Sequence, residues 1–552
     1  MREKSLFFKN LVIPLLLILL SQGIGLRWDM TQDRRFSLNE NTKTLLKGLD
    51  QPIKIDIFLT GKLPADYHRL HREIITLIKG MEEHTDKLVV SYIDPFKGAA
   101  STDELIGEMT QFGMIPEYIV SEQNQAMEQT VVFPWAIIND GRKTHMIPLL
   151  EKILGDDEQQ KINRSIAQLE FHFFDALYKI TQKLKPNIAV LTSHGSSKAT
   201  RITDFIRSLQ PYYQLASFDL KALENYPEKT LENIKRFELL LVSNPTESFS
   251  EKEKYLLDQH LMHGGKQWWA INTVAVNQDS LFNSTGTTIA VKRTLNMDNA
   301  FFKYGFRLKN NLVKDLYCAQ VVLATGNDRK TQYIPYPWTY YPLAIPKYEK
   351  LFGKHSGNVL MPFSSTIDTL KNQLKKTILI SSSNFSQTIQ TPVSLSLKEI
   401  SDKLNPNLFD QKPQPLGLLL EGKFSSVFDN RIPPVELKEK KISGESQMII
   451  FSSGSVAENQ LDKGNPLELG YDKWTNNFYS NKVFLQKTIH HLMGNQKLLH
   501  LQNKTVYLPQ LDFQKVKQIS GLLKTSLLII PLLILLALGG LVYRWRTRKF
   551  GR

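Results

Sequence analysis

The chain has 552 residues, 69 Lys and Arg against 54 Asp and Glu, and one cysteine, Cys318. This length is too great for one hydrophobic core, so several domains are expected. A single cysteine excludes an internal disulfide and a cysteine-based metal cluster. The formal charge of +15 indicates that the binding partner is nucleic acid or an anionic membrane surface. The two ends of the chain, which flank the two most apolar stretches, carry 7 of the 15 excess charges. This placement favours the membrane, and the middle of the chain has no nucleic-acid-binding motif.

The first apolar stretch, residues 11–26, follows a short basic segment. It predicts an N-terminal transmembrane anchor, with a cleavable signal peptide as the alternative. After a polar strip, residues 53–94 carry the pattern strand, helix, strand, which indicates a small α/β unit. The segments 130–138 and 143–150 are predicted to be further strands that close this unit.

A long amphipathic helix is predicted over residues 158–184. Its apolar residues recur every three or four positions: Ile162, Ile166, Leu169, Phe173, Leu177, Ile180 and Leu184. This stripe favours packing on the helix's own domain. A coiled-coil partner is the alternative, although the repeat lasts only about three heptads.

From residue 187 onward the pattern alternates between strand and helix, which predicts an α/β fold with a doubly wound, mostly parallel sheet. The expected strands are 188–192, 214–220, 237–243 and 266–271, and the expected helices are 197–210 and 251–263. Ser250 and Glu253 have the spacing of a capping box at the start of the second helix, and Gly264 follows its end. A strand at 448–453 and a helix near 480–493 are predicted to return to this sheet. The long insertion between them, 285–445, is expected to contain short strands and a helix near 365–375.

The second apolar stretch, residues 522–543, predicts a C-terminal transmembrane helix. It contains a face of small residues suited to helix packing in lipid, formed by Ala537, Gly539 and Gly540. A basic tail follows, which can hold anionic lipid headgroups, and it contains Arg544, Arg546, Arg548 and Lys549. The positive-inside rule then places both termini in the cytoplasm and the body between the spans on the far side of the membrane.

These patterns predict a multidomain α/β body between two membrane spans. The expected segments are an N-terminal transmembrane anchor (1–26), a membrane-proximal α/β domain with the amphipathic helix (27–185), the first part of the parallel-sheet domain (186–284), an insertion or second lobe (285–445), the return to the parallel-sheet domain (446–500), a linker (501–521), the C-terminal transmembrane helix (522–543) and a basic cytoplasmic tail (544–552).

The strongest candidate site is Ser193, His194 and Gly195, directly after the first strand of the predicted parallel sheet. Doubly wound sheets bind ligands at this edge, and a helix start can hold an anion or a hydroxyl-rich ligand. A serine nucleophile would need a strained elbow such as G-x-S-x-G and an acid beside its histidine. The sequence has neither the elbow nor an assignable acid. We therefore predict no catalytic residue here, and at most a binding edge.

The segment 333–346 places five aromatic residues among four prolines. Tyr336 and Trp338 could form a stacking platform for a sugar or a partner peptide. A rigid loop packed on its own domain is the alternative.

Two further classes of site lack their motifs. No G-x-x-x-x-G-K-[ST] occurs in the sequence, so any ATP must be bound by a separate subunit. Three histidine pairs occur without accompanying carboxylates, so surface or helix-end histidines are favoured over a metal site. These pairs are His68 with His71, His260 with His263, and His490 with His491. The sequence thus predicts no cofactor.

Several long stretches together resemble the GldG family of gliding-motility-associated accessory proteins of Bacteroidetes-type ABC transporters. The similar stretches are 27–64, 162–181, 240–272, 295–316 and 337–343. The resemblance implies a bacterial inner-membrane protein that works with a separate ATPase subunit and a permease subunit, and that is needed for gliding and the secretion linked to it. It also implies that the sheet domain is shared with intraflagellar-transport proteins and looks like the amidotransferase type without its catalytic cysteine, a domain proposed to bind sugars.

The chain departs from this family where Ser193 and Ser196 replace a glycine and a glutamate that relatives often carry, and where FSSGS at 451–455 replaces an acidic turn. Fewer carboxylates make metal or sugar chemistry at this edge less favourable. We predict a non-catalytic accessory subunit of an ABC transporter. The alternatives are a periplasmic module that binds glycan or peptidoglycan, and a degenerate hydrolase.

Overall fold

The computed structural model describes residues 37–98, 101–123, 126–151, 157–221, 225–282, 286–327, 330–353, 356–401, 404–503 and 519–550. The chain divides into two compact units, Met1–Thr505 and Val506–Arg552, and each is considered by itself. The predicted N-terminal span, 11–26, lies outside the described residues, as does most of the predicted linker.

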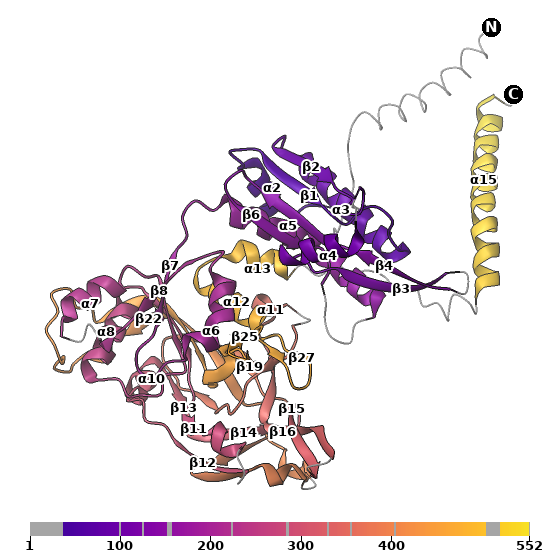
Figure 1. Ribbon diagram of the computed structural model, residues 1–552. Helices are drawn as coiled ribbons and strands as arrows, with labels where there is room; N and C mark the ends of the chain where they lie inside the picture. The colour runs from indigo at the N-terminus through magenta and orange to yellow at the C-terminus, as the bar shows by residue number, and fades with distance from the viewer. Residues whose placement is uncertain are drawn as a thin grey trace. The chain divides into compact units, whose positions relative to one another are not determined.

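The first unit begins with a four-stranded sheet in the order β2-β1-β5-β6 (Figure 1). Its strands are β1 (Ile53–Ile57), β2 (Leu88–Tyr92), β5 (Trp135–Asn139) and β6 (Thr144–Pro148). Helices α3 (Ala65–Glu82) and α5 (Glu158–Thr181) share one hydrophobic core with this sheet. The alternating apolar residues of β1 explain this packing, because Ile53, Ile55 and Ile57 all point into that core.

Other elements of this region give no clear signal in the sequence. They are α2 (Glu40–Lys47), α4 (Thr102–Gln111), and the hairpin of β3 (Glu117–Gln123) and β4 (Ala126–Val132). The strand predicted at 130–138 is divided, because β4 ends at Val132 and β5 begins at Trp135. Pro134 lies between them and cannot donate a backbone hydrogen bond to a sheet.

Helix α5 starts where the sequence predicts but ends earlier. Asp157 and Gln160 form a capping box at its start. The helix ends at Thr181, and Leu184, predicted on its apolar stripe, lies outside it and is 88% exposed. Pro186 follows closely, and the residue before a proline is disfavoured in helical conformation.

The largest sheet of the first unit is mixed, in the order β15-β16-β19-β22-β23-β10-β9-β7-β8, with β17 paired to β16. Parallel pairing joins β8 (Gln214–Phe218), β7 (Asn187–Leu191), β9 (Leu239–Ser243), β10 (Lys266–Ala270) and β23 (Ser443–Phe451). Antiparallel pairing adds β22 (Pro415–Ser425), β19 (Lys375–Ser381), β16 (Lys330–Pro346) and β15 (Cys318–Asn327).

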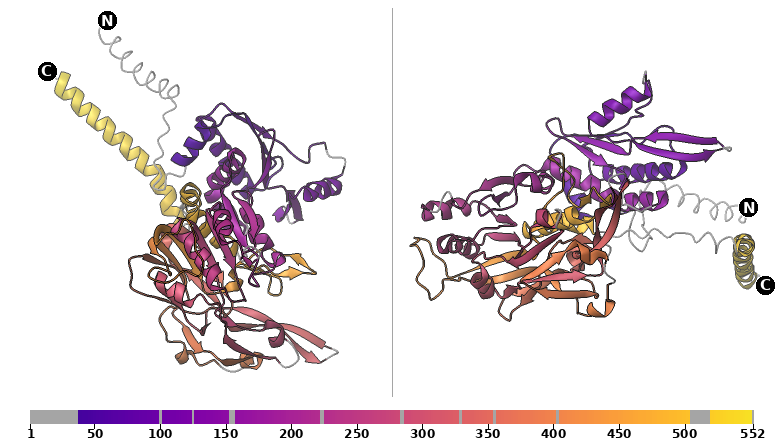
Figure 2. Two further views of the ribbon diagram at one scale, coloured as in Figure 1. Left: turned by 90° about the vertical axis from the view of Figure 1, so that its left-hand side faces the viewer. Right: turned by 60° about the horizontal axis from the view of Figure 1, so that its bottom comes forward.

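The expectation of a mostly parallel sheet is therefore corrected to a mixed one. Its antiparallel strands come from the segment 285–445. The sequence predicts this segment to be an insertion between two parts of the parallel-sheet domain, but its strands β15, β16, β19 and β22 belong to the sheet itself. The reason is apolar continuity: Leu418 of β22 pairs with Ile450 of β23, and both are fully buried. The hairpin of β15 and β16 extends beyond the rest of this sheet (Figure 2).

Helices cover both faces of the parallel strands. Successive side chains of β7 point to opposite faces of the sheet, and each face packs against its own pair of helices. Ile188 and Val190 pack with α6 (Ala199–Leu209) and α12 (Asn481–Leu492). Ala189 and Leu191 pack on the opposite face with α7 (Pro227–Ile234) and α8 (Glu251–Met262). The carboxyl ends of the parallel strands thus lie along one edge, and α8 starts beside it.

The remaining elements surround this sheet. They are β11 (Val274–Ala275), α9 (Gln278–Leu281), β12 (Thr287–Lys292), α10 (Asp298–Tyr304), β13 (Phe306–Leu308), β14 (Asn311–Asp315), α11 (Glu349–Phe352), β17 (Val359–Leu360), β18 (Ile367–Thr369), β20 (Ser386–Gln390), β21 (Val393–Ser396), β24 (Leu461–Asp462), β25 (Asn465–Pro466), β26 (Tyr471–Asp472), β27 (Asn477–Phe478) and α13 (Gln496–Gln502), with short 3-10 helices at Leu397–Ser401, Pro406–Leu408 and Gly454–Ala457. The helix predicted near 365–375 is wrong, since that segment contains the short strand β18, bends and the start of β19. Its β-branched residues suit a strand.

The second unit consists of helix α15 (Ser520–Phe550), which contains Pro531. Within it, Leu523–Phe550 is long and apolar enough to cross a membrane by length and composition. This is the helix that the sequence predicts at 522–543.

Candidate functional site

The turn after β7 is held in an unusual backbone conformation. His194 and Gly195 have φ values of 61° and 60°, the left-handed region that side chains with a Cβ seldom adopt. A Cβ on Gly195 would clash with Oγ1 of Thr246. The carbonyl of His194 accepts hydrogen bonds from the backbone N–H groups of Thr246, at 2.8 Å, and Glu247, at 3.0 Å. The turn is thereby fastened to the segment that follows the neighbouring strand β9.

The structure supplies an acid beside His194 that the sequence does not reveal. Nε2 of His194 lies 3.0 Å from Oε2 of Glu253, and Nδ1 lies 2.9 Å from Oγ of Ser193. The imidazole also stacks on Phe249, with ring centroids 4.1 Å apart. Glu253 is the capping-box residue of α8, and its carboxylate accepts from the backbone N–H of Ser250 at 2.7 Å.

Serine, histidine and carboxylate are thus in contact, as in a hydrolase, but they are enclosed. His194 is 1% exposed, and Ser193 is 9% exposed. Oγ of Ser193 also accepts a hydrogen bond from the backbone N–H of Leu220. Burial raises the pKa of Glu253, but His194 and Ser250 outweigh that effect and hold the pKa below its usual value. This geometry links β7 to α8 through a nearly enclosed contact.

A second polar cluster, which the sequence patterns do not reveal, lies at the carboxyl ends of the parallel strands. The Glu458 carboxylate accepts from Oγ of Ser197, at 2.6 Å, and from Nδ2 of Asn244, at 3.0 Å. Oδ1 of Asn244 accepts from Nη1 of Arg293 at 3.1 Å, and Oδ1 of Asn272 accepts from the backbone N–H of Gly454 at 2.8 Å.

Two signals could have drawn attention to this cluster. Asn244 and Asn272 each follow a strand of the parallel sheet closely, and Asn244 has φ 48°, a left-handed conformation that asparagine tolerates. Their contacts with Glu458 and Gly454 are long-range and cannot be read from local patterns. Because the polar groups of the cluster satisfy one another, it fastens the strand ends together, and Arg201, 4.0 Å from Glu458, reaches the surface beside it.

The aromatic candidates lie elsewhere. Tyr336 and Trp338 are part of β16, which is separated from β7 in the sheet by β19, β22, β23, β10 and β9. Trp338 is 2% exposed and packs against Tyr340, with ring centroids 5.1 Å apart. The segment 333–346 is therefore not a loop, and Trp338 offers no open face for stacking. Tyr336 is half-buried.

The histidine pairs do not form a metal site within the part of the chain that the structure describes, where no group of three or more His, Cys, Asp or Glu side chains could hold a metal ion. His260 and His490 lie in the last turns of α8 and α12, as the helix-end expectation predicts, but neither is at the surface. These side chains are 1% and 4% exposed and bond to Phe237 O and the Tyr213 hydroxyl. Their helices are buried on that side, which the short sequence spacing does not indicate.

The residues predicted to act at the membrane all lie on α15. The small residues Ala537, Gly539 and Gly540 fall in its apolar part, and a Cβ added at either glycine would have no neighbour within 4 Å. The basic group follows at the end of the same helix: Arg544, Arg546, Arg548 and Lys549. The Lys549 ammonium lies 4.7 Å from the ring centroid of Trp545, an arrangement that suits a membrane interface.

Comparisons with known proteins give two family matches. Residues 185–488 match the family described as an ABC-type uncharacterized transport system, and residues 32–139 match a domain of unknown function, DUF7088. None of the curated proteins compared is similar enough to count as a match. Among solved structures, the N-terminal domain of mmIFT52 is similar at 13% identity, with 56% of this chain and 97% of that chain covered and a TM-score of 0.33.

The first family match covers more than half of the 552 residues and includes the whole parallel part of the sheet, the His194 turn and the Glu458 cluster. The chain therefore belongs to this family of auxiliary proteins of an ABC-type transport system.

Proposed function

We propose that the chain is a non-catalytic, membrane-anchored accessory subunit of an ABC transporter linked to gliding motility and secretion. The observation that carries this proposal is the family match over residues 185–488. The link to gliding rests on the resemblance of the long stretches 27–64 and 240–272 to gliding-motility-associated accessory proteins.

The proposed partners are a permease subunit in the membrane and a separate ATPase subunit. The sequence has no phosphate-binding G-x-x-x-x-G-K-[ST] loop, so ATP would be bound by the ATPase alone. The small residues around Gly540 would pack closely against a permease helix, because lipid gives little hydrophobic drive for helix association and close contact supplies it instead.

The proposed location is the bacterial inner membrane, with both termini in the cytoplasm and a large periplasmic body. This topology is supported by the apolar stretch Leu523–Phe550 and by the basic residues at its end. The proposed first span, 11–26, would act as a second tether. Protease added to intact spheroplasts should cleave the body and spare a tag fused after Arg552. Loss of that tag with an intact body would contradict the topology.

The non-catalytic part of the proposal is supported by the use of His194 and Glu253 inside the fold. A degenerate hydrolase would require the Ser193 hydroxyl to reach a substrate, and that hydroxyl is buried under the Leu220 backbone. Cells that lack the chain should not glide, and the Ser193→Ala variant should restore gliding as fully as the unchanged protein. The proposal fails if deletion leaves gliding intact, or if a stable, membrane-located Ser193→Ala protein does not restore it.

Glycan binding is a second candidate function, favoured by the polar cluster of Ser197, Asn244 and Glu458 at the carboxyl edge of the parallel strands. At this edge β8 and β9 lie on opposite sides of β7, the arrangement at which α/β sheets of the doubly wound type bind ligands. Calorimetric titration of the full chain in detergent with soluble peptidoglycan fragments tests it. Saturable binding that is lost in Glu458→Gln supports this function, and no heat of binding argues against it.

A further inference from the structure

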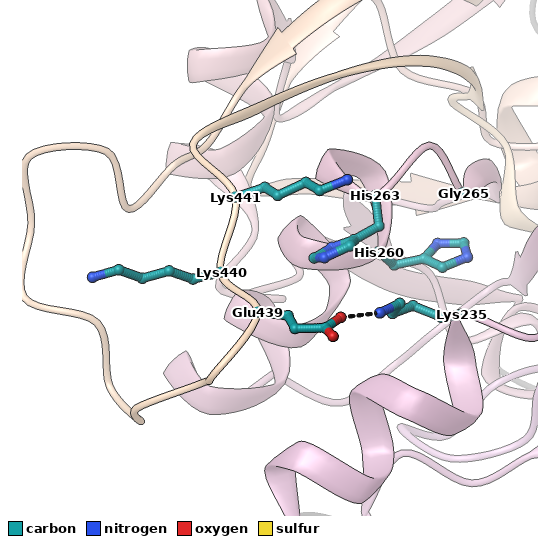
Figure 3. Close-up of a pocket in the computed structure, with 7 residues that line it drawn as sticks. All are labelled: Lys235, His260, His263, Gly265, Glu439, Lys440 and Lys441. Atoms are coloured by element: carbon teal, nitrogen blue, oxygen red, sulfur yellow. Dashed lines mark hydrogen bonds and ion pairs between the residues drawn. The ribbon is translucent and has the colours of Figure 1, made fainter.

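Figure 3 shows a cavity of about 420 Å³. It lies where the parallel strand β10 begins, whereas His194 follows the end of β7 at the opposite edge of the sheet. The cavity is open to solvent on one side and is bounded by the end of α8, the Gly265 turn before β10, and the loop that contains Glu439, Lys440 and Lys441. Lys235, Lys440 and Lys441 line it with one carboxylate, Glu439. Because Lys440 extends away from the cavity (Figure 3), the formal charge directed into it is +1. Such a concentration of positive charge in a concave site favours an anionic ligand.

The loop that covers this cavity is fixed in place at several points. The Gln259 side chain donates to the carbonyl of Lys441 at 2.9 Å and accepts from its N–H at 2.8 Å. The Glu228 carboxylate accepts from the N–H of Lys438 at 2.7 Å. Because side chains of α7 and α8 already hold this loop in place, little conformational entropy is lost when a ligand enters, which favours binding.

Two histidines in the lining each keep one ring nitrogen without a partner among the described residues. Nε2 of His260 lies 3.2 Å from the carbonyl of Phe237, and Nδ1 of His263 lies 2.8 Å from the carbonyl of Gln259. A carbonyl can only accept, so each of these nitrogens carries the proton. The other nitrogens, Nδ1 of His260 and Nε2 of His263, are buried and unpartnered. Such groups are costly unless a ligand or a proton satisfies them.

The surroundings of His263 make its charge sensitive to an anion. Burial lowers the pKa of His263, the Gln259 carbonyl opposes this, Lys235 and Lys441 lower the pKa further, and Glu439 raises it. His260, the other titratable group beside it, is neutral at pH 7 because burial lowers its pKa to about 4. Figure 3 shows Lys441 reaching back toward His263, whereas Lys440 extends away from the cavity. An anion between Lys235 and Lys441 would reverse the repulsion that these lysines exert on a His263 proton.

We propose that this cavity binds a phosphate-type oxyanion, held by Lys235 and Lys441, with His263 taking up a proton to become a third donor. The shared chemistry is a compact group with several anionic oxygens, as in inorganic phosphate or a phosphomonoester lipid headgroup. Lysine and protonated histidine both donate charge-assisted hydrogen bonds to such oxygens.

Glu439 occupies part of this site in the absence of an oxyanion. Its carboxylate lies 2.6 Å from the Lys235 ammonium, while 71% of the side chain is exposed. An entering oxyanion would displace this exposed side chain into solvent. Glu439→Gln should therefore tighten oxyanion binding, whereas removal of a lysine should weaken it.

The test is calorimetric titration of the full chain in a non-ionic detergent, with inorganic phosphate and, separately, with soluble dihexanoyl phosphatidic acid. We expect saturable binding. Lys441→Gln should raise the dissociation constant about tenfold, and Glu439→Gln should lower it about threefold. Changes of this size are typical when one charge-assisted hydrogen bond or one exposed ion pair is removed. Lys229→Gln is the matched control, because Lys229 lies on α7 and does not line the cavity. It should change the affinity less than about twofold.

The proton-linked step is tested with sulfate, whose charge is the same at pH 6 and pH 8. Sulfate should bind more tightly at pH 6, and His263→Asn should abolish this difference. Phosphate binding with the expected variant pattern identifies a free oxyanion, and the same pattern with the lipid probe alone identifies a headgroup. The proposal is overturned if neither probe binds saturably, or if Lys441→Gln and Lys229→Gln bind alike.

Discussion

At the scale of single residues, His194 has the neighbours of a catalytic histidine but no access to solvent. Its two ring nitrogens lie within hydrogen-bond distance of Ser193 and Glu253. A nucleophile must reach its substrate; His194 is 1% exposed and Ser193 is 9% exposed, which supports the proposed non-catalytic role. We propose that the pair has a structural role, because the loss of one partner would leave the other buried without its contact.

This role predicts the effect of Glu253→Gln. Glutamine at this position can still close the capping box with Ser250, so the substitution removes mainly the charge that faces His194. We expect the free energy of unfolding to fall by about 1–3 kcal/mol, because a buried polar group loses its partner. Urea titration monitored by tryptophan fluorescence measures this change. The control is Glu232→Gln, exposed on α7, which should have almost no effect; equal effects would refute the role given to Glu253.

Two buried histidines predict a loss of stability in mild acid. Burial lowers the pKa of His260 and of His490 to about 4. The pKa of histidine in an unfolded chain is about 6.5. Between these values the unfolded chain binds more protons, so stability falls as the pH drops below about 6.5 and the loss is complete near pH 4. At pH 5 each histidine should cost about 2 kcal/mol.

Urea titration at pH 7.5 and pH 5 checks this expectation. His490→Gln can still form a hydrogen bond with the Tyr213 hydroxyl, and should lose less stability between the two pH values than the unchanged protein. The exchange His68→Gln on the exposed side of α3 serves as control. An unchanged pH dependence in His490→Gln would show that this histidine is not the source.

The residues of the candidate site could be predicted only in part from the sequence. Ser193, His194 and Gly195 follow an apolar run and precede a helix, which is a local signal. Glu253 is 59 positions from His194 (253 − 194), and it is marked in the sequence only as a helix cap. The contact of Glu253 with His194 depends on how α8 packs on the sheet, and no local sequence pattern specifies that packing.

At the scale of elements, the boundaries that have a chemical marker were predicted well. The start of α8 is marked by Ser250 and Glu253, whose capping box is present in the structure. The segment 333–346 has a misleading marker, because prolines remove backbone donors and suggest a loop. Pro335 and Pro337 are tolerated in β16 because that part of the strand pairs only with β15 among the described strands. On its other side no described strand needs a backbone hydrogen bond from these residues.

A close approach between two elements predicts the effect of Gly444→Ala. A Cβ at Gly444 of β23 would clash with the backbone of Met262 at the end of α8. Backbone cannot rotate away as a side chain can, so β23 or α8 would have to shift. We expect the free energy of unfolding to fall by about 1–3 kcal/mol, the usual cost of overpacking. Thermal unfolding of the full chain in detergent measures it.

Gly107→Ala is the matched comparison for this substitution. Gly107 lies within α4, and a Cβ there would have no neighbour within 4 Å. Alanine favours a helix over glycine by about 1 kcal/mol, so this variant should be neutral or more stable. If both variants lowered the stability equally, the contact between Gly444 and Met262 would not be the cause.

At the scale of the whole molecule, the parallel strands were predictable and the antiparallel extension was not. Strands β7, β9 and β10 alternate with helices along the chain. Because such connections are right-handed and short, few sheet topologies are compatible with this order. Strands β19 and β22 join the same sheet from within the long segment 285–445. Their positions depend on pairings such as Leu418 with Ile450, which are 32 residues apart (450 − 418) and have no motif.

At this scale we also propose two tethers for one folded body. A body held at both ends stays near its neighbours in the membrane, and its effective concentration beside a permease rises. The apolar stretch of α15 and its basic end support one tether. The packing face around Gly540 is the part of this tether that would touch a permease helix.

Purification of the tagged full chain from its native membranes in a mild detergent tests the accessory role most directly. We expect both an ABC permease and its ATPase subunit to remain bound, and the double variant Gly539→Leu, Gly540→Leu to lose them, because large side chains prevent close helix packing. Leu535→Ile, elsewhere on the same helix, should retain both partners. Recovery of the intact, membrane-located chain with neither a permease nor an ATPase would contradict the account.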